Sequence, residues 1–135
     1  MNLEDAIYSQ LVSDATIGAS VGTRVFPDVI PEDAALPAIA YQRISTPRLY
    51  SMSGPSGLAW PRFQFTMKAT LYATAQALAN ALRASLSGYK GVMGGGAGAG
   101  VRVDAIFIEN ETEDWDESPR TYWRQMDAII WHHEN

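Results

Sequence analysis

The sequence of 135 residues contains no cysteine. This absence excludes a disulfide framework, thiol catalysis and zinc sites with cysteine ligands. No apolar run approaches the ~18 residues that a membrane-spanning helix requires, so we expect no membrane partner. Acidic rather than basic residues open the chain, at Glu4 and Asp5, which favours an intracellular soluble protein over a secreted one. With 47% hydrophobic residues, the chain can build the core of a single domain.

Charge is scarce and unevenly distributed. The net charge is −5 and only 19% of residues are charged, which disfavours nucleic-acid binding as the main activity. No acidic residue occurs between positions 34 and 103, where seven basic residues lie; all 15 acidic residues lie in 1–33 and 104–135. Folding can interleave these blocks into a mixed surface. Alternatively, it can leave a basic and an acidic flank that would be complementary to a second copy of the chain.

Hydrophobic periodicity predicts an α+β domain. Helical spacing runs from Asn2, a capping residue, to about Ser13, and from a cap at Thr74 to about Ser87, with one further turn capped by Asp14. The predicted order of elements is helix, strands, helix, strands. This order is typical of an antiparallel sheet of about four to five strands packed against two main helices. We predict one domain over residues 1–135, with loops at 47–61, 88–100 and 109–119. The predicted extended segments are 24–27, 38–45, 62–71, 101–108 and 121–132, the last two forming a hairpin.

Two motifs resemble catalytic or cofactor-binding loops. The segment 18–22, with Ser20 at its centre, matches the G-x-S-x-G pattern of hydrolases. That chemistry requires a strand before the serine and a helix after it, whereas the order predicted here is the reverse. The glycine run at 94–100 resembles a phosphate-binding loop, but it follows a helix, leads into a strand and lacks a Gly-Lys-Ser/Thr ending. We therefore predict neither an enzyme nor a cofactor.

The residues that could bind a metal do not form a complete site. His132 and His133 are adjacent on a predicted strand and would point to opposite faces, so we expect solvated terminal residues. The acidic segment 109–117 lacks the central glycine and the fixed ligand positions of a calcium-binding EF-hand. We expect a solvated loop whose negative charge would repel DNA phosphates, which would suit a surface that DNA must pass without sticking. Its carboxylates are those of Glu109, Glu111, Glu113, Asp114, Asp116 and Glu117.

Four tryptophans divide by their context. Trp123 and Trp131 have the same parity on a predicted strand, which favours a core or a covered sheet face. Trp60 and Trp115 lie in or beside predicted loops, where an aromatic residue either contacts a partner or folds back on its own domain. The candidate assembly contacts in the predicted loops are Arg48, Tyr50, Met52, Trp60, Lys90 and Met93.

Several stretches in order along the chain resemble the tail-completion proteins of tailed bacteriophages and prophages, a family also described as tail-terminator or head–tail joining proteins. The resemblance covers nearly the whole chain, although the glycine run at 94–100 is longer than is usual in the family. The stretches are LEDAI (3–7), VGTRVFP (21–27), ALPAIAYQRIS (35–45), PSGLAWPRFQ (55–64), ATLYATAQALA (69–79) and IIWH (129–132).

The resemblance implies a structural virion protein that assembles in the host bacterial cytoplasm. It implies a ring, typically a hexamer, that caps the tail tube, meets a head–neck connector protein and lets DNA pass through its bore. It implies no catalytic residue, metal or cofactor. Two alternatives stay open: a neck adaptor on the head side, and a small ligand-binding or regulatory α+β domain, which would carry a pocket with convergent polar groups.

Overall fold

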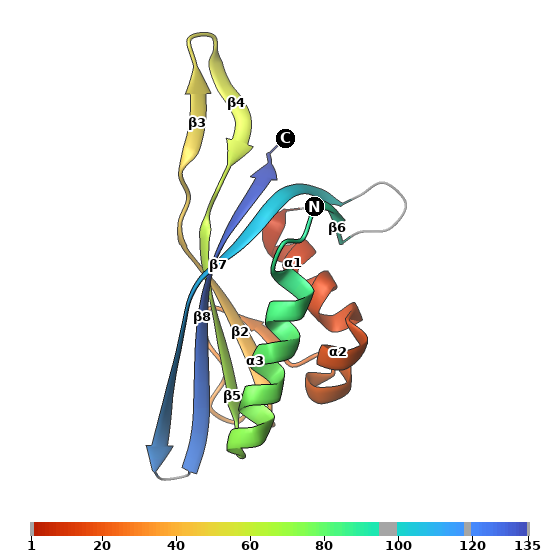
Figure 1. Cartoon of the computed structure of the whole chain (residues 1–135), viewed down its shortest axis with the longest axis vertical. Helices are drawn as coiled ribbons and strands as arrows, with labels where there is room; N and C mark the ends of the chain where they lie inside the picture. The colour runs from red at the N-terminus through yellow and green to blue at the C-terminus, as the bar shows by residue number, and fades with distance from the viewer. Residues whose placement is uncertain (1, 95–99, 118–119, 135) are drawn as a thin grey trace.

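Three helices and eight strands make up the chain in the computed structural model, which describes residues 2–94, 100–117 and 120–134 (Figure 1). The helices are α1 (Leu3–Ser13), α2 (Ala15–Val21) and α3 (Tyr72–Leu86). The strands are β1 (Val25–Pro27), β2 (Ala38–Ser45), β3 (Arg48–Ser51), β4 (Gly54–Ala59), β5 (Arg62–Ala69), β6 (Gly91–Met93), β7 (Val101–Glu117) and β8 (Arg120–His133). No helix in the described part of the chain is long and apolar enough to cross a membrane.

Side-chain caps define the N-terminal helices. The Asn2 side chain accepts a hydrogen bond from the Asp5 N–H at 2.9 Å, and α1 follows directly. Asp14 accepts from the N–H groups of Thr16 and Ile17, both at 3.0 Å, and begins α2, as its sequence position predicts. The predicted cap at Thr74 is wrong: α3 begins at Tyr72, and Leu71 precedes it without a side-chain cap bond.

The sheet is larger and more mixed than four to five antiparallel strands. β8 is its centre, because residues 122–129 pair with β5 and also with β7. β2 pairs with β5, and β1 pairs with β2 in parallel, so the sheet is mixed. β6 adds to β7, while β3 and β4 continue the sheet beyond the end of β8. The predicted α+β class is correct, and the antiparallel pairing of 101–108 with 121–132 is confirmed.

All three helices lie on one face of this sheet, and no helix of the described residues covers the other face (Figure 1). Alternation in β5 follows the prediction: Phe63, Phe65, Met67 and Ala69 are fully buried, and the residues between them are half-buried on the helix-free face. The core joins Phe63, Phe65 and Met67 to buried side chains of β2, β7 and β8 and to the apolar faces of α1, α2 and α3. Burial of a single apolar face in each element therefore sets the two-layer architecture.

The predicted loop at 47–61 is instead a β-hairpin. β3 and β4 pair across a two-residue turn at Met52 and Ser53, and we call residues 48–59 the arm. It arises because β2 continues past Pro47 into β3, and β4 continues past Pro61 into β5. The Trp60 N–H donates to the Pro47 carbonyl at 3.1 Å, so both bends lie together. The prediction followed the Ser, Gly and Pro content and missed the pairing.

The acidic segment is also not a loop, because β7 extends to Glu117 and pairs along its length with β8. Of the predicted loop at 88–100, residues 91–93 form β6. The glycine run at 94–100 lies mostly outside the described residues. The arm projects from one end of the molecule and the β7–β8 hairpin extends to the other (Figure 1).

Candidate assembly surfaces

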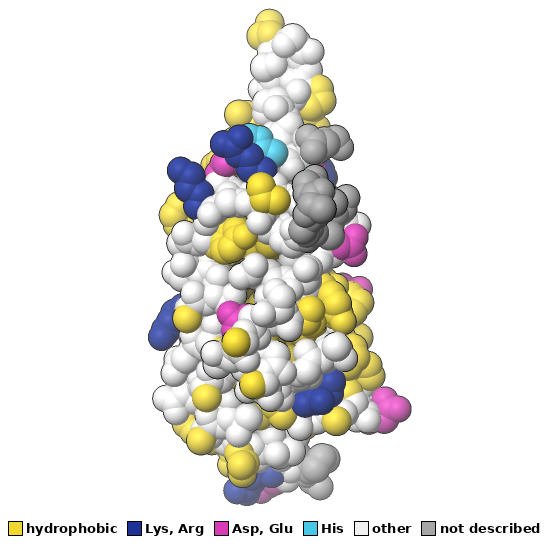
Figure 2. All heavy atoms as spheres, turned by 90° about the vertical axis from the view of Figure 1, so that its right-hand side faces the viewer, with side chains coloured by type: hydrophobic (Ala, Val, Ile, Leu, Met, Phe, Trp, Pro, Cys, Tyr) yellow, Lys and Arg dark blue, Asp and Glu magenta, His cyan; other side chains and the backbone are white. Residues whose placement is uncertain are grey.

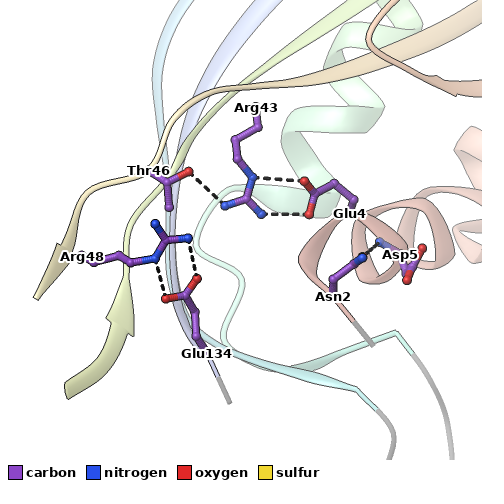
Figure 3. A network of polar contacts seen from close by, with 7 residues as sticks. All are labelled: Asn2, Glu4, Asp5, Arg43, Thr46, Arg48 and Glu134. Atoms are coloured by element: carbon purple, nitrogen blue, oxygen red, sulfur yellow. Dashed lines mark hydrogen bonds and ion pairs between the residues drawn. The ribbon is translucent and has the colours of Figure 1, made fainter. Parts of the chain in front are cut away.

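The base of the arm is attached to both terminal segments of the chain (Figure 3). Arg48 of β3 donates two hydrogen bonds to Glu134, at 2.8 and 3.0 Å. Arg43 of β2 donates to both carboxylate oxygens of Glu4 in α1, at 3.1 and 2.8 Å, and to the Thr46 hydroxyl at 3.0 Å. Bidentate pairs fix geometry better than a single contact, so these pairs hold the base of the arm against the two terminal segments.

The outer part of the arm is uncharged and exposes large hydrophobic side chains. Met52 is fully exposed at the turn, Tyr50 is 66% exposed and Leu49 is 48% exposed. Figure 2 shows hydrophobic side chains at the extremity of this projection. Exposed apolar groups on a projecting hairpin are typical of a contact surface. Three of the predicted assembly contacts lie on the arm: Arg48 at its base, and Tyr50 and Met52 in its outer part.

The other three predicted contacts have different surroundings. Trp60 folds back and stacks on Trp131, with ring centroids 4.7 Å apart, on the helix-free face of the sheet. Lys90 is exposed beside β6. Met93 is fully buried in the core, so its selection as a surface residue is wrong. The sequence could not separate these cases, because all three positions lie beside glycine or proline.

The six carboxylates of 109–117 divide into two groups. Glu111 and Glu113 bind Arg124, which also donates to the Tyr72 hydroxyl, and Tyr72 donates to Glu113 at 3.1 Å. Glu109 lies 3.4 Å from Arg62. Asp114, Asp116 and Glu117 are exposed on the last part of β7. Three of the six acids therefore stabilise the fold, and three lie at the far end of the molecule from the arm.

A hollow of about 320 Å³ lies between the start of α3 and this end of the β7–β8 hairpin. Its wall includes Tyr72 and Tyr122, packed edge to face, together with Arg124. Trp115 is 52% exposed at its margin, with the Arg120 guanidinium 5.5 Å from its ring. The polar groups of this hollow already bind one another, so it does not resemble a catalytic constellation.

The two histidines do point to opposite faces, as their adjacency predicts. His133 lies 2.8 Å from Asp104. His132 is only 4% exposed and neither ring nitrogen has a hydrogen-bond partner, so the prediction of a solvated residue is wrong for it. Burial lowers the pKa of His132 below its ordinary value. The described residues contain no group of three or more metal-binding side chains.

The hydrolase motif has no catalytic setting. Ser20 lies within α2, not at a turn between a strand and a helix. The charge blocks interleave: arginines from the basic middle of the chain bind acids from both flanks, as Arg43 does with Glu4 and Arg48 with Glu134. Figure 2 shows a mixed surface on the helix-covered side. Of the two arrangements left open by the sequence, the structure favours the interleaved one.

These features define a small α+β structural subunit with two projecting hairpins. The tail completion protein gp17 family model matches residues 5–133, and the chain belongs to this family. It is thus a bacteriophage tail completion protein in class. A chain in the virion of a native gene transfer agent particle has the same fold: the TM-score is 0.76 at 22% identity, over 97% of this chain and 94% of that one. No curated protein matches the sequence.

Proposed function

We propose that the chain forms a ring, typically of six copies, that caps the tail tube and joins the tail to the head–neck connector. Its family supports this proposal, as does the similar chain found in a gene transfer agent virion. The observation that carries the proposal is the arm, a hairpin with no charge beyond Arg48 at its base, whose hydrophobic tip is exposed in the single chain and would be covered in an assembly. In this account the protein is a tail or neck component assembled in the host bacterial cytoplasm.

The described surfaces suit different neighbours. The arm and the exposed Lys90 region would contact the tail tube protein or a neighbouring copy. The exposed carboxylates of Asp114, Asp116 and Glu117 would face the bore or its rim, where negative charge repels the DNA that passes during ejection. The protein itself would perform no chemistry, because the ring's function requires only geometry and surface charge.

Mixing experiments test the proposal and its head-side alternative. Purified protein is incubated separately with tail tubes and with portal-bearing heads, and each mixture is sedimented and imaged. We expect co-sedimentation with tubes and density at one tube end. Binding to heads but not to tubes would instead identify a neck adaptor. A stable monomer that binds neither would contradict the proposed function.

A further inference from the structure

We propose that the outer edge of β7, over residues 111–117, pairs with a second copy of this chain and extends one continuous sheet from copy to copy. The edge that it would meet is formed by residues 42–51 of β2 and β3. This inference rests on the proposed ring and specifies how its subunits join.

The outer side of β7 is open along its distal half. β6 covers only residues 101–103, and the Gly88 N–H donates to the Ile106 carbonyl at 3.0 Å. Beyond that point, the described residues provide no other strand on this side of β7, while the inner side is paired with β8 through Glu117. β7 contains neither glycine nor proline. From Asn110 its register with β8 is regular, so its outer edge is a long template for another strand.

Hydrogen bonding shows which backbone groups point outward. The Ile130 N–H donates to the Pro61 carbonyl, on the side of β8 away from β7. Alternation along β8 directs the backbone groups of Arg124 and Tyr122 the same way. Their partners on β7, Glu113 and Trp115, therefore direct their backbone groups outward. The Trp115 N–H accordingly bonds the neighbouring Asp114 carboxylate at 2.8 Å, a local contact that a carbonyl from another strand would replace.

The distribution of acidic side chains indicates which edge of a second copy would pair with β7. Two β7 edges placed together would bring carboxylates against carboxylates, which disfavours self-pairing. At the opposite side of the sheet, β1 covers only residues 39–41 of β2, and β3 ends the strand order. The outer edge from 42 to 51 contains no acidic residue, and its Arg48, which pairs with Glu134, has a side chain that is 45% exposed. This edge lacks the carboxylate repulsion that opposes self-pairing of β7, so a second copy is the occupant that the sheet itself provides.

The contact would be heterologous, because it uses two different edges of the chain. Heterologous contacts close into rings when the rotation between copies permits. The open part of β7 lies at the end of the molecule opposite the arm, whereas the partner edge leads into the arm (Figure 1). Neighbours would therefore be offset along the strand direction, with their strands oblique to the ring axis, as in a closed barrel.

A proline at position 113 tests the backbone contact, and an alanine there is its matched control. Both Glu113→Pro and Glu113→Ala remove the carboxylate that binds Arg124 and Tyr72, but only proline removes the outward N–H. Proline is tolerated where an edge N–H faces solvent, so both should fold. We expect Glu113→Pro to weaken each contact between copies about tenfold relative to Glu113→Ala, as measured by ring and tube-cap formation. Glu117→Pro and Glu117→Ala repeat the comparison at the end of the strand.

Equal assembly of the proline and alanine variants would overturn the edge contact while leaving the ring intact. Failure of the unmodified protein to form rings or caps would instead overturn the proposed function. Crosslinking identifies the partner edge, because the chain has no cysteine. With a short bis-maleimide, the double variant Tyr50→Cys/Asp116→Cys should give covalent multimers up to the full ring. Covalent dimers of the single variant Asp116→Cys would show self-pairing of β7 and contradict the proposal.

Discussion

At the residue scale, Arg124 has the largest number of polar partners at the acidic end of the molecule. Its side chain is 14% exposed, binds Glu111 and Glu113, and lies 5.8 Å from the Tyr72 ring. We predict that Arg124→Leu lowers the free energy of unfolding by about 2 kcal/mol, because it leaves two carboxylates unpaired beside α3. Urea denaturation of both proteins measures this difference in the free energy of unfolding. Arg102→Leu is the control: its side chain is 69% exposed, so its ion pair should contribute less than about 0.5 kcal/mol. Equal losses would contradict the assigned role.

His132 gives a pH dependence with a defined sign. Burial lowers its pKa, so the unfolded chain binds a proton more readily than the folded one. Stability should therefore be full above pH ~6.5, the ordinary pKa of histidine, and fall as the pH falls through the lowered value. His132→Phe should remove this decline. The hydrogen bonds from Arg43 lower the pKa of Glu4, so both proteins should show a second decline below pH ~4.3. An unchanged profile between pH 5 and 7 in His132→Phe would contradict this assignment.

At the scale of elements, the contact role proposed for the arm predicts that its tip contributes little to stability. Met52 is fully exposed, so Met52→Ser should change the free energy of unfolding by less than about 0.5 kcal/mol. The same change should reduce the number of capped tubes seen in electron micrographs, because it removes the apolar tip. Ser53→Ala, in the same turn, is the control and should leave capping unchanged. Capping by Met52→Ser at the unmodified level would exclude the arm tip as a contact.

Replacing all six acids of residues 109–117 would change both the stability of the subunit and its repulsion of DNA. The structure allows these two effects to be tested separately. Asp114→Asn/Asp116→Asn/Glu117→Gln should leave stability nearly unchanged and promote retention of DNA in the particle, because the repelling charges are removed. Glu109→Gln/Glu111→Gln/Glu113→Gln should instead destabilise the subunit, because Arg62 and Arg124 lose their partners. Genome release assays measure the first effect and thermal unfolding the second. Normal infectivity without DNA retention in the first variant would contradict the assignment of these carboxylates to the bore.

The elements that sequence predicted well are those whose pattern is local. Capping residues and helical spacing located α1 and α2, and strict alternation located β5. The arm and the distal half of β7 were missed because of their composition, although each pairs with the next strand along the chain. Serine, glycine and acidic residues weaken the strand signal there, but the partners β4 and β8 satisfy the backbone. The burial of Met93 and His132 depends on tertiary packing that no local pattern encodes.

At the scale of the whole molecule, the chain combines a rigid two-layer body with projections at both ends (Figure 1). We propose that the subunit acts through its shape and its surface, in line with the tail completion family to which it belongs. The central claim is that copies of this subunit close into a ring on the end of a tail tube.

Averaged electron micrographs of tube ends test this claim most directly. Tail tubes are imaged with and without the purified protein, and end views are classified without imposed symmetry. We expect an annular density with an open bore at one end of each tube, present only when the protein is added. Tube ends that look identical in both samples, with the protein remaining monomeric in the supernatant, would contradict it.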